Sequence, residues 1–308
     1  MHGSYECVQS VVGEGEGMSF VSAVSKMMGT SESASGKSSN TLTERLVDFL
    51  ANYEDDYAND TYFHVSSLYY MCPRCEIYKA VLPAEMLPQD RLDAITKARF
   101  DVGHAMHYWY QNKYLGPMGV LKGKWQCSRC HDVVRGLMPT GFCKKCAGEG
   151  RDKVKEWVFD ETVVLSKKWN IKGKTDGVLV LDDLEYVLDI KTCKPSLFGS
   201  LKSAWPSGVY QVQVYMWLLK IERGILLYVD KSVDGSTPVK EFPVEYSLDT
   251  INNTKGKIAA FQMAMESKTM PDCLCRARSF GLTCPVIEKS PGVQGFMEKW
   301  VESGSEMV

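Results

Sequence analysis

A β-hairpin is predicted between residues 178 and 190, and it determines where the charged side chains around it lie. Val178–Leu181 and Tyr186–Ile190 are short, mostly apolar runs of the length typical of strands. Asp182 and Asp183 lie between them as the expected turn. A two-residue turn sets residue 176 opposite residue 189, and a four-residue loop sets it opposite residue 191.

Two carboxylates and an ammonium group therefore lie on one face of the hairpin. Strand side chains alternate between faces, so Asp189 and Lys191 share one, and either loop length places Asp176 there too. Carboxylates opposed across a sheet repel each other. A divalent cation between them would turn this cost into a binding site.

Four short motifs occur in the order in which one nuclease superfamily carries them. They are Gly103–His107 (Gly-His-Ala-Met-His), Gly173–Asp176 (Gly-Lys-Thr-Asp), Asp189–Lys191 (Asp-Ile-Lys) and Gln211–Tyr215 (Gln-Val-Gln-Val-Tyr). With these motifs the chain resembles the PD-(D/E)xK nuclease superfamily, and most closely the RecB, AddB and Cas4 nuclease domains. The resemblance implies an α/β fold in which a central mixed sheet is flanked by helices, with a zinc-binding insertion.

The same motifs imply a divalent-metal site. Asp176, Asp189 and His107 would bind Mg²⁺ or Mn²⁺, and the resemblance adds the backbone carbonyl of Ile190 as a further ligand. The imidazole favours manganese, because nitrogen ligands suit transition ions better than magnesium. Lys191 would position the attacking water or stabilise the charge that develops on phosphorus.

Three further residues have alternative interpretations. Gln211 and Tyr215 are one helical turn apart and share a face. The resemblance implies that their helix borders the active site, where it contacts DNA or orients the lysine. The alternative is a surface residue for Gln211 and a packed aromatic for Tyr215. His104 competes with His107, but the four-residue spacing from Gly103 favours His107.

Two Cys-x2-Cys pairs, twelve residues apart, predict a structural zinc site. Cys127, Cys130, Cys143 and Cys146 supply four thiolates, which suit a closed tetrahedral shell. The ion either folds a segment too small to have its own core or also presents basic residues to DNA. The candidate DNA-binding residues are Lys122, Lys124, Arg129, Arg135, Lys144 and Lys145.

A second group of cysteines flanks the nuclease motifs. The arrangement resembles the staple of AddB and Cas4, in which a 4Fe–4S cluster ties the chain ends together. The resemblance implies Cys72, Cys273, Cys275 and Cys284 as ligands. The C-terminal spacing of Cys-x-Cys-x8-Cys departs from that family, and Cys75 is a fifth candidate for four positions. A second zinc ion, with Cys72, Cys75 and two later cysteines as its ligands, is the alternative.

The net charge of −2 conceals two segments of opposite charge. Residues 1–60 contain ten acidic and three basic residues, and residues 113–155 contain ten basic and three acidic ones. We expect residues 1–60 to be acidic and partly flexible, with short helices and a possible role in binding a protein partner. Thr41 and Glu44 are typical of a capping box before a core helix. Residues 61–308 would form the RecB/Cas4-like nuclease domain, which the basic zinc ribbon 113–155 interrupts.

The sequence predicts a metal-dependent deoxyribonuclease. Its start lacks the pattern of a signal peptide, and no apolar stretch is long enough to span a bilayer. We therefore expect the eleven cysteines to be reduced, metal-binding thiols of a cytoplasmic protein, or of the host cytoplasm for a phage protein. The resemblance implies an exonuclease, or an end- or flap-processing enzyme, that prefers single strands and acts in DNA repair, recombination, replication or phage DNA metabolism. The alternative is a non-catalytic nucleic-acid-binding or assembly protein on a nuclease-derived fold.

Overall fold

The structure is a computed structural model that describes residues 41–52, 61–88, 93–148, 156–232, 238–275 and 283–305. The chain divides into two units, residues 1–47 and residues 48–308. Most of the predicted acidic region 1–60, with its predicted partner-binding role, lies outside the described residues. Within the described ranges, every helix is too short or too polar to pass through a lipid bilayer.

Helix α2 (Leu42–Asn52) begins with the predicted capping box. The Thr41 N–H donates to Glu44 Oε2 at 2.7 Å, and the Glu44 N–H donates to Thr41 Oγ1 at 3.2 Å. The apolar side chains Leu42, Leu46 and Phe49 are exposed. The capping box is therefore confirmed, whereas the expectation of a core helix is wrong.

A mixed sheet forms the centre of the larger unit. Its strands run in the order β10 (Val239–Glu245), β9 (Arg223–Asp230), β8 (Leu184–Cys193), β7 (Gly177–Leu181), β2 (Leu121–Cys127) and β3 (Val133–Leu137), and β4 (Trp157–Asp160) also pairs with β2. Strands β8 and β9 are parallel, and the other pairs are antiparallel. Strand β2 lies inside this sheet, so the basic segment 113–155 is continuous with the central fold.

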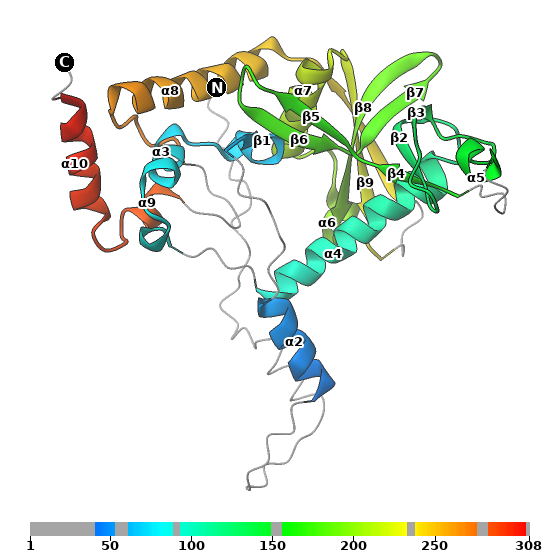
Figure 1. Cartoon of the computed structure of the whole chain (residues 1–308), viewed down its shortest axis with the longest axis horizontal. Coiled ribbons are helices and arrows are strands. Elements are labelled where there is room, and N and C mark those ends of the chain that lie inside the picture. Colours follow the sequence, from blue (N-terminus) through cyan, green and yellow to red (C-terminus); the bar gives the residue numbers. More distant parts are fainter. Residues whose placement is uncertain are drawn as a thin grey trace, which may run out of the picture. The chain divides into compact units, whose positions relative to one another are not determined.

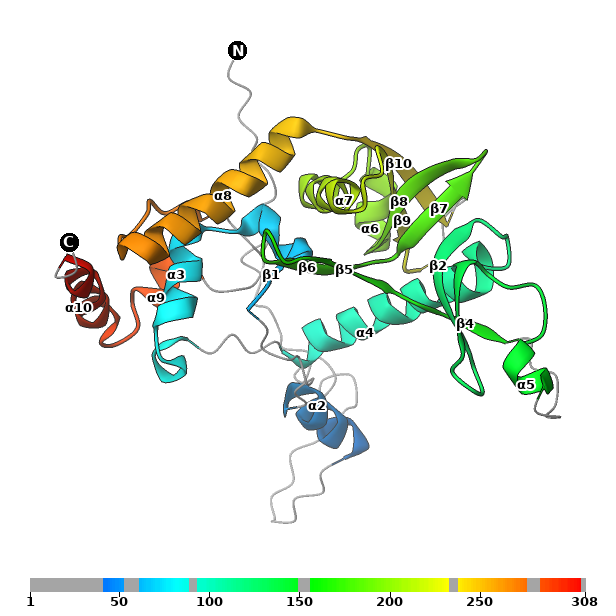
Figure 2. The ribbon, with the colours of Figure 1, turned by 45° about the horizontal axis from the view of Figure 1, so that its top comes forward.

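Helices cover both faces of this sheet. They are α6 (Pro195–Ser200), α7 (Pro206–Leu219), α4 (Ala94–Trp109) and the π-helix η3 (Tyr110–Leu115) that continues α4. Because strand side chains alternate, Val187 and Leu226 pack in one core with α7, whereas Leu188 and Ile190 pack in a second core with α4. Figure 2 shows α7 and α4 on opposite sides of β8 and β9. The predicted α/β class, a mixed sheet flanked by helices, is confirmed.

The predicted hairpin is strands β7 and β8. Leu181 pairs with Leu184 and Gly177 pairs with Leu188, which is the register of a two-residue turn. The turn residues Asp182 and Asp183 have φ values of 49° and 62°. Two consecutive left-handed residues are what a type I′ turn requires, and its twist matches the twist of paired strands. The shorter of the two predicted loops is therefore confirmed.

A smaller sheet precedes the hairpin. It contains β1 (Phe63–His64), β6 (Ile171–Thr175) and β5 (Thr162–Ser166), with β6 in the middle. Strand β6 ends at Thr175 and β7 of the central sheet begins at Gly177. Asp176 is thus the one residue at the corner where the chain passes from the small sheet to the central sheet.

Further helices form a third core. They are α3 (Pro73–Val81), η2 (Ala84–Met86), α8 (Leu248–Ser267), α9 (Cys284–Ile287) and α10 (Val293–Ser305). The 3-10 helix η1 (Val65–Tyr70) packs instead in the core that contains α7. Figure 1 shows α8 extending from α7 to α3, and α8 contacts both. Ile77, Ile287 and Val293 bring α3, α9 and α10 together in this core. The short α5 (Lys144–Gly148) belongs to the cysteine-rich segment instead.

Candidate active site and metal centres

Asp176 is bound on three sides at the corner between the sheets. Its Oδ2 accepts a hydrogen bond from the Ile190 N–H at 2.6 Å, and its Oδ1 lies 2.9 Å from Nδ1 of His107. The side chain of Gln111, in η3, donates to the Asp176 backbone carbonyl at 3.0 Å. These contacts bring the predicted residues Asp176 and His107 together and fix the carboxylate, which is 8% exposed.

The sequence around Asp176 explains the sharp corner. Gly177 has a φ of 146°, a conformation that side-chain-bearing residues rarely adopt. A Cβ at this position would also lie 2.4 Å from Cδ1 of Leu121. The buried Thr175 hydroxyl donates to the Gly177 carbonyl at 3.1 Å and closes the bend. Thr-Asp-Gly is therefore a structural unit that aims the carboxylate of Asp176.

Glu161 joins this site, although the sequence analysis did not identify it. One ligand atom from each of His107, Glu161 and Asp176 lies within 4.8 Å of the other two. Strands β5 and β6 pair Thr162 with Thr175, so the residues just beyond that pair, 161 and 176, emerge side by side. The residues around Glu161 form no motif, because its position depends on this pairing.

Gln111 was also missed, and here the sequence does contain a signal. Gln111 is four residues after His107, a spacing that places two helical side chains on one face. Gln111 and its neighbour Asn112 are buried polar residues of η3. The Asn112 side chain accepts a hydrogen bond from the Phe159 N–H at 2.6 Å and so ties η3 to β4.

Asp189 and Lys191 lie beside this group, on the α7 side. Lys191 Nζ is 2.9 Å from Asp189 Oδ2 and donates to Gln211 Oε1 at 2.8 Å. The contact with Asp189 lacks hydrogen-bond geometry, so Asp189 Oδ2 is a buried oxygen with no hydrogen-bond partner among the described residues. Asp189 was predicted as a metal ligand, but the three closely grouped donors are His107, Glu161 and Asp176.

The electrostatics of the site reflect crowded, buried carboxyl groups. Burial raises the pKa of Asp189 to about 6, against the lowering effect of the Lys191 ammonium. Burial also raises the pKa of Glu161, and the charge of Asp176 adds to the rise. Burial alone would lower the pKa of His107, but the charge and hydrogen bond of Asp176 raise it above its ordinary value. A bound cation would favour the ionised carboxylates in each case.

The donor set fits a divalent metal ion. Two carboxylates and an imidazole within 4.8 Å of one another are ligands that Mn²⁺ accepts, and Mg²⁺ accepts the carboxylates. The buried Asp189 Oδ2, which lacks a hydrogen-bond partner in the described part of the chain, adds an oxygen that a cation or its water could contact. The role of the Ile190 backbone carbonyl as a ligand stays a prediction.

The other predicted site residues have the following positions. Gln211 contacts Lys191, as the lysine-orienting role requires. Tyr215 is buried in the core, and its hydroxyl donates to the Lys174 carbonyl at 2.5 Å, as the packed-aromatic alternative describes. A Cβ at Gly173 would lie 2.7 Å from the Tyr215 hydroxyl, which explains the glycine of that motif. His104 is exposed, and His107 is the histidine at the site.

The first cysteine group is assembled as predicted. The sulfurs of Cys127, Cys130, Cys143 and Cys146 all lie within 4.8 Å of one another. Cys127 and Cys146 are separated by 3.8 Å, and Cys130 and Cys143 by 3.5 Å. Cys127 ends β2 and Cys146 lies in α5. These four thiols can bind one metal ion in a closed shell.

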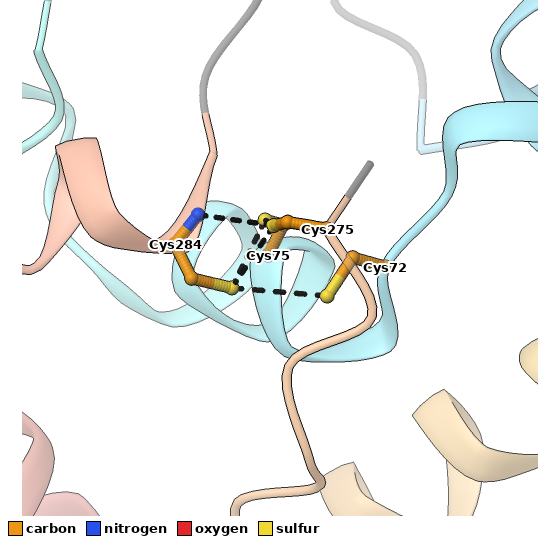
Figure 3. Close-up of side chains that lie close together, drawn as sticks. All are labelled: Cys72, Cys75, Cys275 and Cys284. Carbon is orange, nitrogen blue, oxygen red and sulfur yellow. Dashed lines mark hydrogen bonds between the residues drawn. The ribbon is translucent and has the colours of Figure 1, made fainter. Parts of the chain in front are cut away.

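The second cysteine group differs from the expected set at one position. Cys72, Cys75, Cys275 and Cys284 have sulfurs within 4.8 Å of one another (Figure 3), whereas Cys273 is exposed and does not belong to this group. Cys72 and Cys75 lie together because they are the N-cap and third residue of α3. Cys75 therefore replaces Cys273 in the geometry, because the helix turns its sulfur toward the other three.

Lys122 and Lys124, which are predicted DNA-binding residues, form ion pairs with other residues that the structure describes. Lys122 pairs with Glu185, and Lys124 pairs with Asp160. These pairs partly neutralise both ammonium groups. The other four, which are exposed, are Arg129, Arg135, Lys144 and Lys145.

No family model and no curated protein matches the chain. In structure it is similar to SSO0001, with a TM-score of 0.37 and 17% identity over 72% of this chain and 82% of that one. It is also similar to LHK-Exo, an alkaline exonuclease from Laribacter hongkongensis, in complex with dAMP, with a TM-score of 0.39 and 9% identity over 80% and 95% of the two chains. It is similar as well to a phage-related exonuclease from Haemophilus somnus 129PT, with a TM-score of 0.28 and 13% identity over 66% of this chain and 92% of that one. At these TM-scores and identities, the likenesses carry no conclusion about function.

Proposed function

We propose that this protein is a metal-dependent DNA nuclease that acts on free ends or single strands. The observation that carries the proposal is the convergence of His107, Glu161 and Asp176 beside the buried Asp189 and the ammonium of Lys191. These groups come from α4, the two sheets and the turn between them. Their arrangement concentrates negative charge next to one oriented cationic side chain, as phosphodiester cleavage with a divalent ion requires.

Each residue has a distinct role in this proposal. Asp176, Glu161 and His107 would bind Mg²⁺ or Mn²⁺, which when bound supplies Lewis-acid stabilisation of a phosphate oxygen and a more acidic water. His107 Nδ1 lies 2.9 Å from Asp176 Oδ1, so an ion beside this pair would contact the imidazole and the carboxylate together. Lys191, oriented by Gln211 and balanced by Asp189, would donate hydrogen bonds to a phosphate oxygen or to the attacking water.

The exposed aromatic residues near His107 support a preference for single strands. Tyr108, Trp109 and Tyr114 are 43%, 51% and 47% exposed, and they lie in α4 and η3 on either side of the segment that carries Gln111. Unpaired bases stack on aromatic side chains, whereas the bases of a duplex are already stacked. The zinc-bound basic segment would then contact the DNA backbone through exposed basic residues such as Arg135 and Lys144.

The cellular setting belongs to the same proposal. A role in DNA repair, recombination, replication or phage DNA metabolism follows from the resemblance of the four motifs alone. The proposed cytoplasmic location is supported by the cysteines, which suit metal binding as reduced thiols.

Cleavage of labelled DNA tests the proposed function. Single- and double-stranded DNA carrying a 5′ or a 3′ label is incubated with Mn²⁺, Mg²⁺ or EDTA. We expect cleavage with Mn²⁺ and none with EDTA, and a loss of at least about a hundredfold in Lys191→Ala and Asp176→Asn, because each change removes a charge from the reacting site. Lys194→Ala, which removes an exposed lysine three residues further on, is the matched control and should cleave normally.

Two outcomes would contradict the proposal. Cleavage that persists in EDTA would exclude the metal-dependent reaction. DNA binding without cleavage in Mn²⁺ would instead indicate the non-catalytic binding protein.

A further inference from the structure

The distances within the second cysteine group indicate how many metal atoms it can surround. The sulfur–sulfur separations are 3.7 Å for Cys72 and Cys284, 3.1 Å for Cys75 and Cys275, 3.2 Å for Cys75 and Cys284, and 3.5 Å for Cys275 and Cys284. Four sulfurs at ~2.3 Å from one central zinc ion in a tetrahedron would be ~3.8 Å apart. The group therefore has the dimensions of a single-ion site, or is slightly tighter.

A 4Fe–4S cluster does not fit between these sulfurs. In such a cluster each thiolate binds a different iron, and four irons and four sulfides occupy the space between the ligands. Its thiolates therefore cannot approach one another to near van der Waals contact, as all four do here. The cluster that the resemblance implies disagrees with this geometry.

The first cysteine group provides an internal comparison. Its Cys-x2-Cys pairs have the spacing of a zinc site, and its sulfurs are separated by 3.5 and 3.8 Å. The two groups thus have similar dimensions within one chain, and the second is slightly tighter. Both consist of four cysteines whose sulfurs lie within 4.8 Å of one another.

Backbone N–H groups support the second set of sulfurs. The Leu274 N–H donates to Cys72 Sγ at 3.1 Å, and the Cys284 N–H donates to Cys275 Sγ at 3.3 Å. Such bonds to ligand atoms orient a metal shell from outside. They also show that the segment next to Cys275 is already positioned against α3, on which Cys72 and Cys75 lie (Figure 3).

We propose that Cys72, Cys75, Cys275 and Cys284 bind one zinc ion, in place of the 4Fe–4S cluster that the resemblance implies. The ion cross-links α3 to the C-terminal segment that begins after α8. Zinc has no redox chemistry, so this cross-link does not respond to oxidation of a metal centre. The inference does not depend on nuclease activity, because metal content is measured without DNA.

Metal analysis of the full-length protein tests the inference. The protein is purified without oxygen from cells supplied with both iron and zinc, and iron, zinc and acid-labile sulfide are counted per chain. We expect zinc in both cysteine groups, no iron and no sulfide, with only sulfur neighbours at ~2.3 Å in X-ray absorption of the zinc. Iron with an equal amount of acid-labile sulfide would overturn the inference. A zinc content that accounts for the first cysteine group alone would overturn it too.

Two cysteine variants identify the ligands. Cys75→Ser should contain one zinc fewer than the wild type, whereas the matched Cys273→Ser, in the exposed cysteine, should keep the full amount. The reverse result would return Cys273 to the ligand set and overturn the assignment. If Cys75→Ser does not fold, the iron, zinc and sulfide content of the wild type still decides the identity of the metal.

Discussion

The candidate active site places a costly charge on one residue, Asp189. Its side chain is 3% exposed, and one of its oxygens has no hydrogen-bond partner among the described residues. The ammonium of Lys191 offsets part of this cost, and Gln211 orients that ammonium. A buried charge of this kind is destabilising unless a metal cation is bound beside it. Carboxyl groups with shifted pKa values are characteristic of functional sites.

The variant Asp189→Asn should be more stable than the wild type in EDTA at pH 7. The pKa of Asp189 is about 6 in the folded protein, so the folded state binds this proton more tightly than the unfolded state does. The protonated group therefore contributes stability below its ordinary pKa, and this contribution is lost as the pH rises through about 6. The neutral amide avoids this loss, which amounts to at most about 3 kcal/mol at pH 7. Urea unfolding at several pH values measures the difference, which should shrink toward pH 4.

An exposed carboxyl group is the control for this prediction. Asp272→Asn should change the free energy of unfolding by less than about 0.5 kcal/mol at either pH. A stability gain of Asp189→Asn that is equal at pH 4 and pH 7 would contradict the explanation by buried charge.

At the scale of elements, the site depends on strand pairing and on one corner. Asp176 occupies the single position between β6 and β7, and Gly177 allows the bend there. The pairing of β5 with β6 brings Glu161 to Asp176 from the other side. The π-helix η3 turns Gln111 toward the same corner, as interruptions of this type often do at functional sites.

Glu161→Gln should weaken Mn²⁺ binding by about ten- to a hundredfold, because it removes one anionic ligand from the group of three. Thermal unfolding with increasing Mn²⁺ measures the effect, since an ion that binds only the folded state raises its stability. Binding to the wild type should strengthen as the pH rises, because the raised pKa values of Glu161 and His107 mean that protons compete with the ion.

Glu156→Gln is the matched control, because Glu156 is exposed and immediately precedes β4. It should bind Mn²⁺ as the wild type does. Equal Mn²⁺ stabilisation of Glu161→Gln and the wild type would remove Glu161 from the site.

On the scale of the whole molecule, the central sheet and the peripheral helices have different sources of stability. The sheet is covered by α7 and α4 and buries two apolar cores. The helices α3, α9 and α10 share a smaller core in which three of the four second-group cysteines are buried. A small core of this kind depends on a cross-link more than a large one does.

Hydrogen exchange of Cys75→Ser should therefore increase locally. We expect at least tenfold faster exchange in α9 and α10, because loss of the ion frees the C-terminal segment from α3, and little change in β8 and β9. Cys273→Ser should exchange like the wild type throughout. Uniformly faster exchange, including the central sheet, would show that the metal stabilises the whole fold instead of its periphery.

Local patterns determined much of the candidate site. The two-aspartate turn and the alternation of side chains are properties of a few adjacent residues, and they specified the hairpin and the shared face of Asp176, Asp189 and Lys191. They left two loop lengths open, and the structure selected the register of the shorter one. The contact between Gln211 and Lys191 was implied by the resemblance of the Gln211–Tyr215 motif, and the structure shows it as a hydrogen bond. Cys127 and Cys130 were recognised as ligands because their spacing is local.

Only the tertiary structure decided which residues from distant segments meet. Glu161 reaches Asp176 through the pairing of β5 with β6, and Cys75 joins Cys275 and Cys284 because α3 packs against the C-terminal segment. Neither choice could be made from spacing, since many chain paths bring the same segments near each other. The sequence by itself thus determined which charged residues share one face of the hairpin, whereas packing over long sequence separations brought Glu161 to it as a candidate ligand and Cys75 to the second cysteine group.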